Sequence, residues 1–245
     1  MFVLQVIYED DEILVCYKPA GVATQTKRIG QQDMESLIRN YRARKKEQPY
    51  VGIVHRLDQP VEGVMVFGKN PTATAFLNKQ VQERSIGKNY YAATLKVGRR
   101  FIPKKDTLTD YMTFDSRSNV GEILHDDLSH LDKMSRQNVK KAVLDYKIIG
   151  EDELKLLFDI NLHTGRHHQI RLQLSNIGCP IIGDTKYGNV VDEDVNDGVN
   201  VKKCGLALCS YRISFVHPKT KEEMEFKIEP QNIEIQKLLQ VVIDK

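Results

Sequence analysis

The most informative polar residues of the sequence lie between two short apolar runs. Val51–Val54 leads into His55, Arg56 and Asp58, and Val64–Phe67 follows them. Apolar runs of this length are typical of buried strands, and a loop between rigid strands often carries reactive side chains. A carboxylate held there could act as a nucleophile or a general base. The alternative is an aspartate that only caps its own turn. Position alone favours neither interpretation.

A second segment carries a tyrosine that could contact a ligand. In the run Lys88-Asn-Tyr-Tyr-Ala, strand alternation places Tyr90 and Ala92 on one face and Tyr91 on the other. Taken in isolation, a tyrosine on a strand is more often a core residue than a binding residue. This segment therefore becomes informative only together with others.

A third segment, His163–Arg171, is rich in basic and imidazole side chains. Its Thr-Gly-Arg turn precedes a predicted helix, and free backbone amides at a helix start suit a carboxylate or a phosphate. Arg166, His167, His168 and Arg171 surround this turn. The alternative for Arg171 is a surface residue whose aliphatic stem packs on the core.

Two apparent nucleotide-binding motifs fail on inspection. His-Arg-Leu-Asp resembles the catalytic loop of kinases, but a leucine intervenes and no glycine-rich loop precedes it. Gly63–Lys69 has the spacing of a phosphate-binding loop, but its middle residues Val-Met-Val-Phe must pair as a strand. Asn70 also replaces the metal-binding Ser or Thr. The sequence therefore predicts no nucleotide cofactor.

Composition places the chain among ordinary globular proteins. It has 245 residues, 41% hydrophobic and 28% charged, with a net charge of +3 that is too small to indicate a nucleic-acid partner by itself. No apolar run reaches the length of about 18 residues that a membrane span needs, and the N-terminus lacks the pattern of a signal peptide. We expect a cytoplasmic protein that binds no membrane.

The four cysteines form no CxxC pair and fit reduced thiols better than a disulfide framework. They are Cys16, Cys179, Cys204 and Cys209. A zinc site would need ligand spacings that Cys204, Cys209 and the three histidines at 163, 167 and 168 do not show. We therefore expect no metal.

Hydrophobic patterns predict an α+β fold with a mixed, largely antiparallel sheet and flanking helices. Helices are expected where apolar residues recur at helical spacing: behind Asp33, behind Asn70-Pro71, over Ile170–Ile177 and over Ile235–Val242. Strands are expected at Ile13–Tyr17, Val51–Val54, Val64–Phe67, Tyr90–Val97, Ala142–Ile149, Leu154–Leu162, Ala207–Val216 and Met224–Ile228. The length of the chain fits one well-buried core or two small ones, and no linker divides it. Together with the family resemblance described below, this leads us to expect a single domain over residues 1–245.

The net charge conceals an uneven distribution along the chain. Residues 84–105 hold seven Lys or Arg and no acid, and residues 39–46 hold five and no acid. A solvated surface is the usual fate of such runs. A basic face for a phosphate backbone is the sharper alternative.

Taken in order, the motifs resemble those of the RluA-type pseudouridine synthases along nearly the whole chain. The motifs are Lys18-Pro-Ala-Gly21, His55-Arg-Leu-Asp58, Lys88-x-Tyr-x-Ala92, Ala142-x-Leu-x-Tyr146, Gly165-Arg-x-His-Gln-Ile-Arg171, Gly183-Asp-x-x-Tyr-Gly188, Leu206-Ala-Leu208 and Phe215-x-His-Pro218. Each motif alone is weak, but their order is specific. The resemblance implies the pseudouridine synthase fold, with an active-site cleft across the sheet.

The resemblance also implies a mechanism in which Asp58, Tyr90 and Arg171 share one cleft. Asp58 would detach uracil from C1′ of a uridine in an RNA chain, and the base would turn and rejoin through C5 without a cofactor. Arg171 would pair with Asp58 and keep its carboxylate ionised. Tyr90 would stack on the base and assist proton transfer from C5.

Further residues are implied to bind the substrate, which would be structured RNA with splayed bases, in rRNA or tRNA. They are His55, Arg56, Arg166, His168, Gln169 and Leu208, of which Arg56 would hold the flipped-out nucleotide and Leu208 would close the base pocket. The chain leaves no room for an N-terminal S4 domain, so we expect its own surface to bind the RNA backbone, through Arg84, Lys88, Arg99, Arg100, Lys104 and Lys105. No obligatory protein partner is expected, and the protein should be a monomer.

The chain departs from the family pattern where substrate choice could be affected. Val61-Glu62 replaces the usual Thr-Ser, His167 stands where Thr is common, and Cys209-Ser210 replaces a frequent His-Ala. Two alternatives stay open: an RNA-binding or RNA-folding protein of the same fold that has lost catalysis, and a hydrolase using Asp58 with His55 or His168. Asp58, Tyr90 and Arg171 together argue against the first, and the lack of a Gly-x-Ser-x-Gly or paired-acid motif argues against the second.

Overall fold

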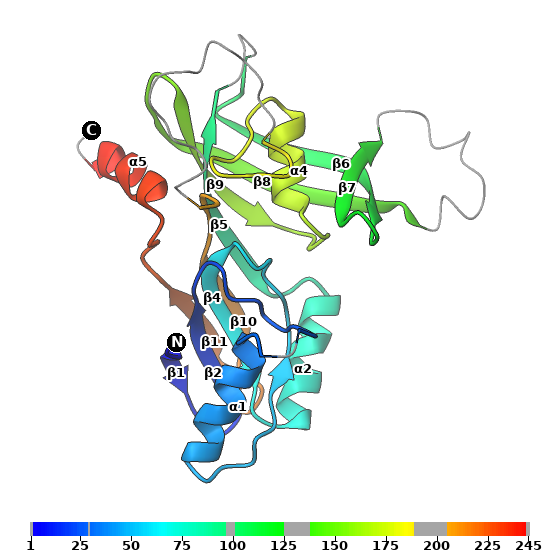
Figure 1. The fold of residues 1–245 in the computed structure, drawn as a ribbon, viewed down its shortest axis with the longest axis vertical. Helices are drawn as coiled ribbons and strands as arrows, with labels where there is room; N and C mark the ends of the chain where they lie inside the picture. Colours follow the sequence, from blue (N-terminus) through cyan, green and yellow to red (C-terminus); the bar gives the residue numbers. More distant parts are fainter. Residues whose placement is uncertain (1, 29, 97–100, 125–137, 189–204, 244–245) are drawn as a thin grey trace. The chain divides into compact units, whose positions relative to one another are not determined.

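The structure is a computed structural model that describes residues 2–28, 30–96, 101–124, 138–188 and 205–243. The chain divides into two compact units, residues 1–89 with 209–231 (unit 1) and residues 90–208 with 232–245 (unit 2). Eleven strands and four helices lie in the described residues, and the strands pair mostly antiparallel (Figure 1). The predicted α+β class with a mixed, largely antiparallel sheet is confirmed. A single catalytic domain over residues 1–245 stays a prediction.

Unit 1 is built on four neighbouring strands in the order β1-β2-β4-β10, in which β4 and β10 run parallel. Two shorter strands extend it, since β3 pairs with β4 and β11 pairs with β10. The strands are β1 (Gln5–Glu9), β2 (Ile13–Lys18), β3 (Gly52–Ile53), β4 (Glu62–Gly68), β10 (Leu208–Val216) and β11 (Glu223–Lys227). Hydrophobic side chains of β2, β4, β10 and helix α2 form the core of this unit.

The helices of unit 1 begin where their capping residues predict. α1 (Met34–Arg44) starts after Asp33, whose carboxylate accepts from the amide of Ser36 in a capping box. α2 (Pro71–Gln82) starts after Asn70, whose side chain accepts from the amide of Ala73. Pro71 is the first residue of this helix. Proline has no amide hydrogen, but an amide at this position would have no partner within the helix, so no hydrogen bond is lost.

Unit 2 contains the strand order β5-β9-β8-β6-β7 and the helices α4 (Gln169–Asn176) and α5 (Ile233–Ile243). Its strands are β5 (Gly87–Leu95), β6 (Lys105–Asp115), β7 (Val120–Leu124), β8 (Lys140–Glu151) and β9 (Lys155–Leu162). β5 and β10 each contribute residues to both units. The expected strand Ala142–Ile149 lies within β8, and the buried side chains of β8 alternate along it, so that one face is buried.

In the sequence, Leu154, Leu156, Phe158, Ile160 and Leu162 alternate with mostly polar positions, which predicts a strand with one buried face. This prediction is only partly correct. Leu156, Phe158 and Ile160 are buried as expected, but Leu154 precedes the strand and is 43% exposed. Leu157, on the opposite face, is fully buried as well. Helix α5 contacts β8 and β9, and a Cβ on Gly150 of β8 would meet both α5 and Leu157 at about 3.1–3.2 Å. Both faces are therefore covered at the start of β9.

Three strands, β1, β6 and β7, were not expected. The sequences of β6 and β7 have no uninterrupted apolar run or alternation. β6 exposes most of its side chains, and only Met112 is buried. β7 pairs with β6 as the second strand of a hairpin, and α4 contacts it. These strands are held by backbone pairing with their neighbours, a feature that side-chain periodicity does not register.

Candidate active site

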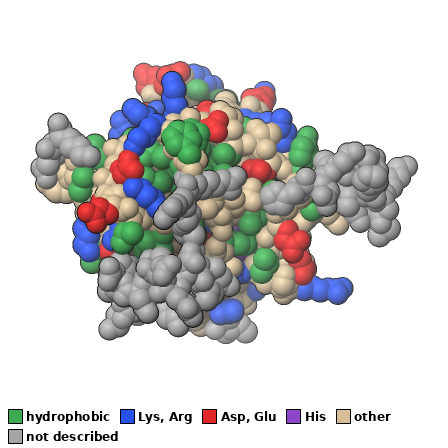
Figure 2. Space-filling model, turned by 90° about the horizontal axis from the view of Figure 1, so that it is seen from above, with side chains coloured by type: hydrophobic (Ala, Val, Ile, Leu, Met, Phe, Trp, Pro, Cys, Tyr) green, Lys and Arg blue, Asp and Glu red, His purple; other side chains and the backbone are tan. Residues whose placement is uncertain are grey.

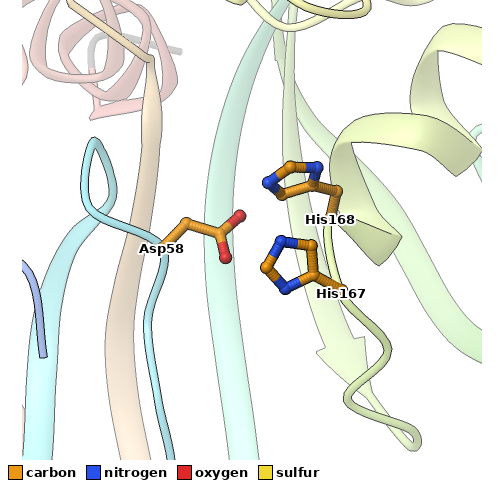
Figure 3. Close-up of side chains that lie close together, drawn as sticks. All are labelled: Asp58, His167 and His168. Atoms are coloured by element: carbon orange, nitrogen blue, oxygen red, sulfur yellow. The ribbon is translucent and has the colours of Figure 1, made fainter. Parts of the chain in front are cut away.

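The Asp58 loop of unit 1 is anchored on both sides of the carboxylate residue. On one side, the hydroxyl of Thr24 accepts from the amide of Leu57 at 3.1 Å and donates to its carbonyl at 3.0 Å. On the other side, the carbonyl of Gln59 accepts from the amide of Gly21 at 2.8 Å. Figure 3 shows the Asp58 side chain leaving this loop. The backbone that carries the carboxylate is therefore fixed by the turn that follows β2.

Lys18 completes this anchorage from the end of β2. Its side chain is fully buried, and its ammonium group donates to three carbonyl oxygens: those of Pro19, Val22 and Gln59, at 3.1, 2.6 and 3.1 Å. Burial lowers the pKa of Lys18 to about 7, against the opposing charges of Asp58 and Glu62. Lys18 is the first residue of the Lys18-Pro-Ala-Gly21 motif, but the sequence alone indicated no role for its side chain. Its position beside the Asp58 loop becomes visible only in the fold.

His55 and Arg56, the two predicted substrate-binding residues of this loop, are held differently. The Nε2 atom of His55 accepts from the amide of Val66, so its proton lies on Nδ1, which has no partner among the described residues. Burial and the charge of Lys88 lower the pKa of His55 to about 3. Arg56 is exposed, and its Nη2 donates to the side-chain carbonyl of Gln25 at 2.9 Å.

Two departures from the family pattern, Glu62 and Cys209, are neighbours in the parallel pairing of β4 and β10. Glu62 is 3% exposed, and its carboxylate accepts from the hydroxyl of Tyr17 at 2.6 Å and from the amide of Gln231 at 3.0 Å. Burial and the adjacent Glu62 carboxylate raise the pKa of the Cys209 thiol well above its usual range. The extra charge of Glu62 is thus accommodated inside unit 1.

Gly63 is required by its neighbour on β10. A Cβ added to Gly63 would lie 2.4 Å from the Cβ of Ser210 and 2.7 Å from its carbonyl oxygen. Ser210, another departure from the family pattern, therefore lies against a position where only glycine fits.

In unit 2, Arg171 forms a buried bidentate ion pair with Asp184. Its Nε and Nη2 donate to the two carboxylate oxygens at 2.7 and 2.8 Å, and both residues are at most 5% exposed. Hydrogen bonds and the charge of Arg171 lower the pKa of Asp184 against the effect of burial. Sequence analysis placed both residues in family motifs without predicting this pair. Arg171 belongs to unit 2 and Asp58 to unit 1, so their pairing stays a prediction.

Figure 3 shows the imidazoles of His167 and His168 in the segment that leads into α4. Each contacts aromatic and polar neighbours. Nδ1 of His168 lies 2.9 Å from the hydroxyl of Tyr187, which also accepts from the amide of Gly121 at 2.8 Å. Burial and the charge of Arg171 lower the pKa of His168 to about 3. His168 also has a left-handed backbone (φ 55°), which costs a non-glycine residue about 1–2 kcal/mol and often marks functional sites.

His167, which replaces a common threonine, is exposed and contacts two rings. Its centroid lies 4.2 Å from that of Phe114 and 4.1 Å from that of His168. Its Nε2 lies 3.1 Å from the side-chain oxygen of Asn119 in the β6–β7 turn. The residue at this position thus connects the α4 segment to that hairpin.

Gln169 and Arg166 shape the turn before α4. The side-chain oxygen of Gln169 accepts from the hydroxyl of Thr164 and from the amide of Arg166, and its amino group donates to Val143 and Gln173. Nε of Arg166 donates to the carbonyl of Lys141 at 3.0 Å. Substrate binding by these two residues stays a prediction, and their contacts are those of residues that hold the turn.

Tyr90 and Leu208 are both buried residues of unit 2. Tyr90 lies on β5 with buried Ala92 on the same face, as predicted, and Leu208 is the first residue of β10. Asp58 belongs to unit 1, whereas Tyr90 and Arg171 belong to unit 2. The single cleft across the sheet, and the catalytic assignments, therefore stay predictions.

The residues predicted to bind the RNA backbone differ in their exposure and in whether an acidic residue pairs with them. Arg99 and Arg100 lie outside the described residues. Lys104 pairs with Glu151, which also accepts from Lys96 at 2.7 Å. Arg84 and Lys105 are exposed, and Lys88 is half-buried with a pKa lowered by burial. On the face shown in Figure 2, Lys and Arg side chains are interspersed with Asp and Glu. A basic interface here stays a prediction.

The surroundings of the two candidate imidazoles do not favour the hydrolase alternative. A general base works best when its pKa lies near the working pH, and both candidate imidazoles, His55 and His168, have pKa values of about 3. Cys16, Cys179 and Cys209 are buried and form no disulfide with one another, and Cys204 lies outside the described residues. None of the described helices is both long and apolar enough to span a membrane.

Comparisons with known proteins identify the family of this chain. The family model described as RNA pseudouridylate synthase matches residues 12–176. A protein of Aquifex aeolicus named an uncharacterized RNA pseudouridine synthase is 32% identical over 92% of this chain and 69% of its own. The ribosomal large subunit pseudouridine synthase D of Neisseria meningitidis is 31% identical over 91% of this chain and 57% of its own. The chain thus spans between about half and two thirds of the length of these relatives.

The solved structure of human RNA pseudouridylate synthase domain containing 4 has the same fold, with a TM-score of 0.74 and 17% identity over 98% of this chain and 93% of its own. This likeness supports the fold alone. The family model and the sequence relatives define the class as the RNA pseudouridine synthases, which are isomerases. The chain belongs to the RNA pseudouridylate synthase family and is of the RluA type.

Proposed function

We propose that this chain converts uridine to pseudouridine within RNA, with Asp58 as the catalytic residue. The observation that carries the proposal is the anchorage of the Asp58 loop: the backbone on both sides of the carboxylate is hydrogen-bonded to the turn after β2. A nucleophile or base must be held in position before it can accelerate a reaction. The family match supplies the class of reaction.

The reaction is an isomerisation, so every atom of the uridine is retained apart from exchanged protons. The bond between C1′ and N1 breaks, with Asp58 attacking C1′ or acting as a base. The uracil then turns, and a bond forms between C1′ and C5. If Asp58 has attacked C1′, the bond between its carboxylate and C1′ breaks in this step; if it has acted as a base, it returns the proton that it removed. The proton on C5 leaves and N1 gains one. No oxidant, reductant or cofactor is required by this balance.

Arg171 and Tyr90 have supporting roles in this proposal. Asp184 accepts from Nε and Nη2 of Arg171 and so orients the plane of the guanidinium. We propose that Arg171, held in this way, orients the Asp58 carboxylate during the reaction. Tyr90 would stack on the uracil and assist the removal of the C5 proton.

The substrate proposed is structured RNA, with rRNA favoured over tRNA. Relatives from Neisseria meningitidis and Buchnera aphidicola are named as pseudouridine synthases of the large ribosomal subunit. Extruding a base costs a few kcal/mol and costs least in an unpaired loop. We propose that the protein acts as a monomer in the cytoplasm, without a cofactor or an obligatory protein partner.

Mapping of pseudouridines in total RNA tests the proposal. RNA from cells with and without this gene is compared, and the gene is restored as the wild type or as Asp58→Asn. The proposal predicts at least one uridine that is modified only with the wild-type gene. An unchanged map would contradict it, and RNA binding without any dependent site would support the non-catalytic alternative.

A further inference from the structure

We infer that two consecutive residues, Thr24 and Gln25, position the two functional side chains of the Asp58 loop: Thr24 acts on Asp58 and Gln25 acts on Arg56. The inference rests on the proposed function, and it adds two residues to which no motif assigns a role. Both contacts lie within unit 1.

Thr24 holds the residue next to Asp58 by both of its backbone polar groups. The hydroxyl accepts from the amide of Leu57 and donates to its carbonyl. Thr24 is 3% exposed and Leu57 is 7% exposed, so water does not compete for these bonds. A hydroxyl is the smallest side-chain group that can both donate and accept in this way. The peptide groups on either side of Leu57 are thus fixed together.

Thr24 is itself fixed by the start of α1. Its carbonyl accepts from the amide of Glu35 at 3.2 Å, and the carbonyl of Ala23 accepts from the amide of Met34 at 2.9 Å. These are first-turn amides, which have no partner inside the helix. The hydroxyl of Thr24 therefore sits on a rigid element, as a positioning group must.

Gln25 points the other way and holds a side chain. It is exposed, and its side-chain carbonyl accepts from Nη2 of Arg56 at 2.9 Å. Its amino group donates to Glu35 at 2.7 Å, and Glu35 is paired with Arg39 at 2.5 Å. Because Glu35 accepts from the amino group, the carbonyl of Gln25 is directed at Arg56. Gln25 thus fixes the direction of the guanidinium that is proposed to hold the flipped-out nucleotide.

The two residues should affect different kinetic constants. Misplacing a catalytic carboxylate by about 1 Å can lower a rate by about 100-fold, whereas loosening a side chain that binds substrate equally before and during the reaction raises KM alone. A merely structural role for either residue would lower stability without separating kcat from KM. A change in kcat alone for a Thr24 variant, and in KM alone for a Gln25 variant, therefore distinguishes positioning from a merely structural role.

The experiment measures turnover as tritium released from C5 of uridine. The probe is RNA labelled with [5-³H]uridine, isolated from cells that lack this gene. For Thr24→Val, which keeps the shape but removes the hydroxyl, we expect kcat to fall about tenfold or more, with KM within about twofold. Thr24→Ser keeps the hydroxyl and should restore most of kcat. For Gln25→Ala we expect KM to rise about 3- to 10-fold, with kcat within about twofold.

Thr26→Val is the matched control, because Thr26 lies on the same turn as Thr24. Among the hydrogen bonds of the described residues, the Thr26 hydroxyl takes part in one, which it accepts from the amide of Arg28. This control variant should leave both constants unchanged. If the wild type turns over and Thr24→Val behaves as Thr26→Val does, or if Gln25→Ala lowers kcat instead of raising KM, the inference is wrong. A wild type that releases no tritium would instead contradict the proposed function. Gln25→Ala changes an exposed residue, so its test does not depend on whether Thr24→Val folds.

Discussion

Arg171 and Asp184 form a bidentate ion pair with N–O distances of 2.7 and 2.8 Å, inside unit 2 and almost fully shielded from water. Asp184 lies 13 residues beyond Arg171 in the sequence. No local sequence pattern predicts that two residues at this separation form an ion pair. The pair gives the guanidinium a defined plane before any substrate binds. Asp184 is therefore a positioning residue for a predicted catalytic arginine.

Replacing Asp184 by asparagine should destabilise the protein strongly. Removing one partner of a buried ion pair typically costs about 3–5 kcal/mol, because the other charge stays buried. Urea unfolding of Asp184→Asn should show a loss of this order. Glu122→Gln, which removes an exposed carboxylate from β7 of the same unit, should change the free energy of unfolding little. Equal stability of the two variants would refute the structural role of the pair.

The ion pair of Arg171 and Asp184 also predicts how the free energy of unfolding changes at acidic pH. The pKa of Asp184 is lower in the folded protein than its usual value of 3.8, so its ionised form stabilises the folded state above about pH 4. That stabilisation is lost as the pH falls through the lowered pKa. The difference in stability between the wild type and Asp184→Asn should therefore narrow below pH 4, as measured by urea titrations between pH 2.5 and 7.

Lys18 predicts a rise of stability in the alkaline range. Its pKa is lowered from 10.5 to about 7 in the folded protein, so between these values the unfolded chain binds one proton more than the folded chain. The free energy of unfolding then rises with pH, with a contribution that approaches about 1.4 kcal/mol per pH unit between pH 7.5 and 10. Below pH 7 the lysine is charged in both states and the contribution is flat.

The variant Lys18→Met should lack this contribution, and Lys79→Met, which removes an exposed lysine of α2, should retain it. Unfolding free energies from urea titrations at four values between pH 7 and 10 measure the slopes. Parallel slopes for Lys18→Met and the wild type would show that Lys18 does not change its protonation between the two states.

The basic stretch predicts a salt-dependent contribution to RNA binding. Each phosphate contact adds about 0.7–0.9 to the slope of log K against log salt. Replacing Arg99, Arg100, Lys104 and Lys105 by glutamine should weaken binding and reduce this slope by about one or more. Filter binding of bulk rRNA between 50 and 300 mM KCl measures it, with Lys79→Gln as the control. Lys104 should contribute least, because Glu151 already neutralises it. An unchanged slope would remove the stretch from the interface.

Local signals in the sequence predicted the elements that depend on them. Asp33 and Asn70 start α1 and α2 because side-chain caps act within three residues. The hairpin of β10 and β11 follows from two apolar runs around His217-Pro218. β6 was missed because its pairing with β8 and β7 is a property of the backbone and not of its mostly exposed side chains.

The candidate site shows the same division. Asp58 could be located from a loop between apolar strands together with the family motifs. The supports of that loop could not, because Lys18 and Thr24 approach it across 41 and 33 positions of sequence. Contacts between residues so far apart in the sequence depend on strand register, which a single sequence does not specify.

The most direct test of the account is tritium release from [5-³H]uridine-labelled RNA by the wild type and by Asp58→Asn, measured together with RNA binding by each. Asparagine keeps the shape of the side chain but cannot act as a nucleophilic carboxylate or a general base. The account predicts release by the wild type, at least a 1,000-fold lower rate for Asp58→Asn (about 4 kcal/mol in the barrier), and RNA binding within about threefold. Release by Asp58→Asn at the wild-type rate would contradict it.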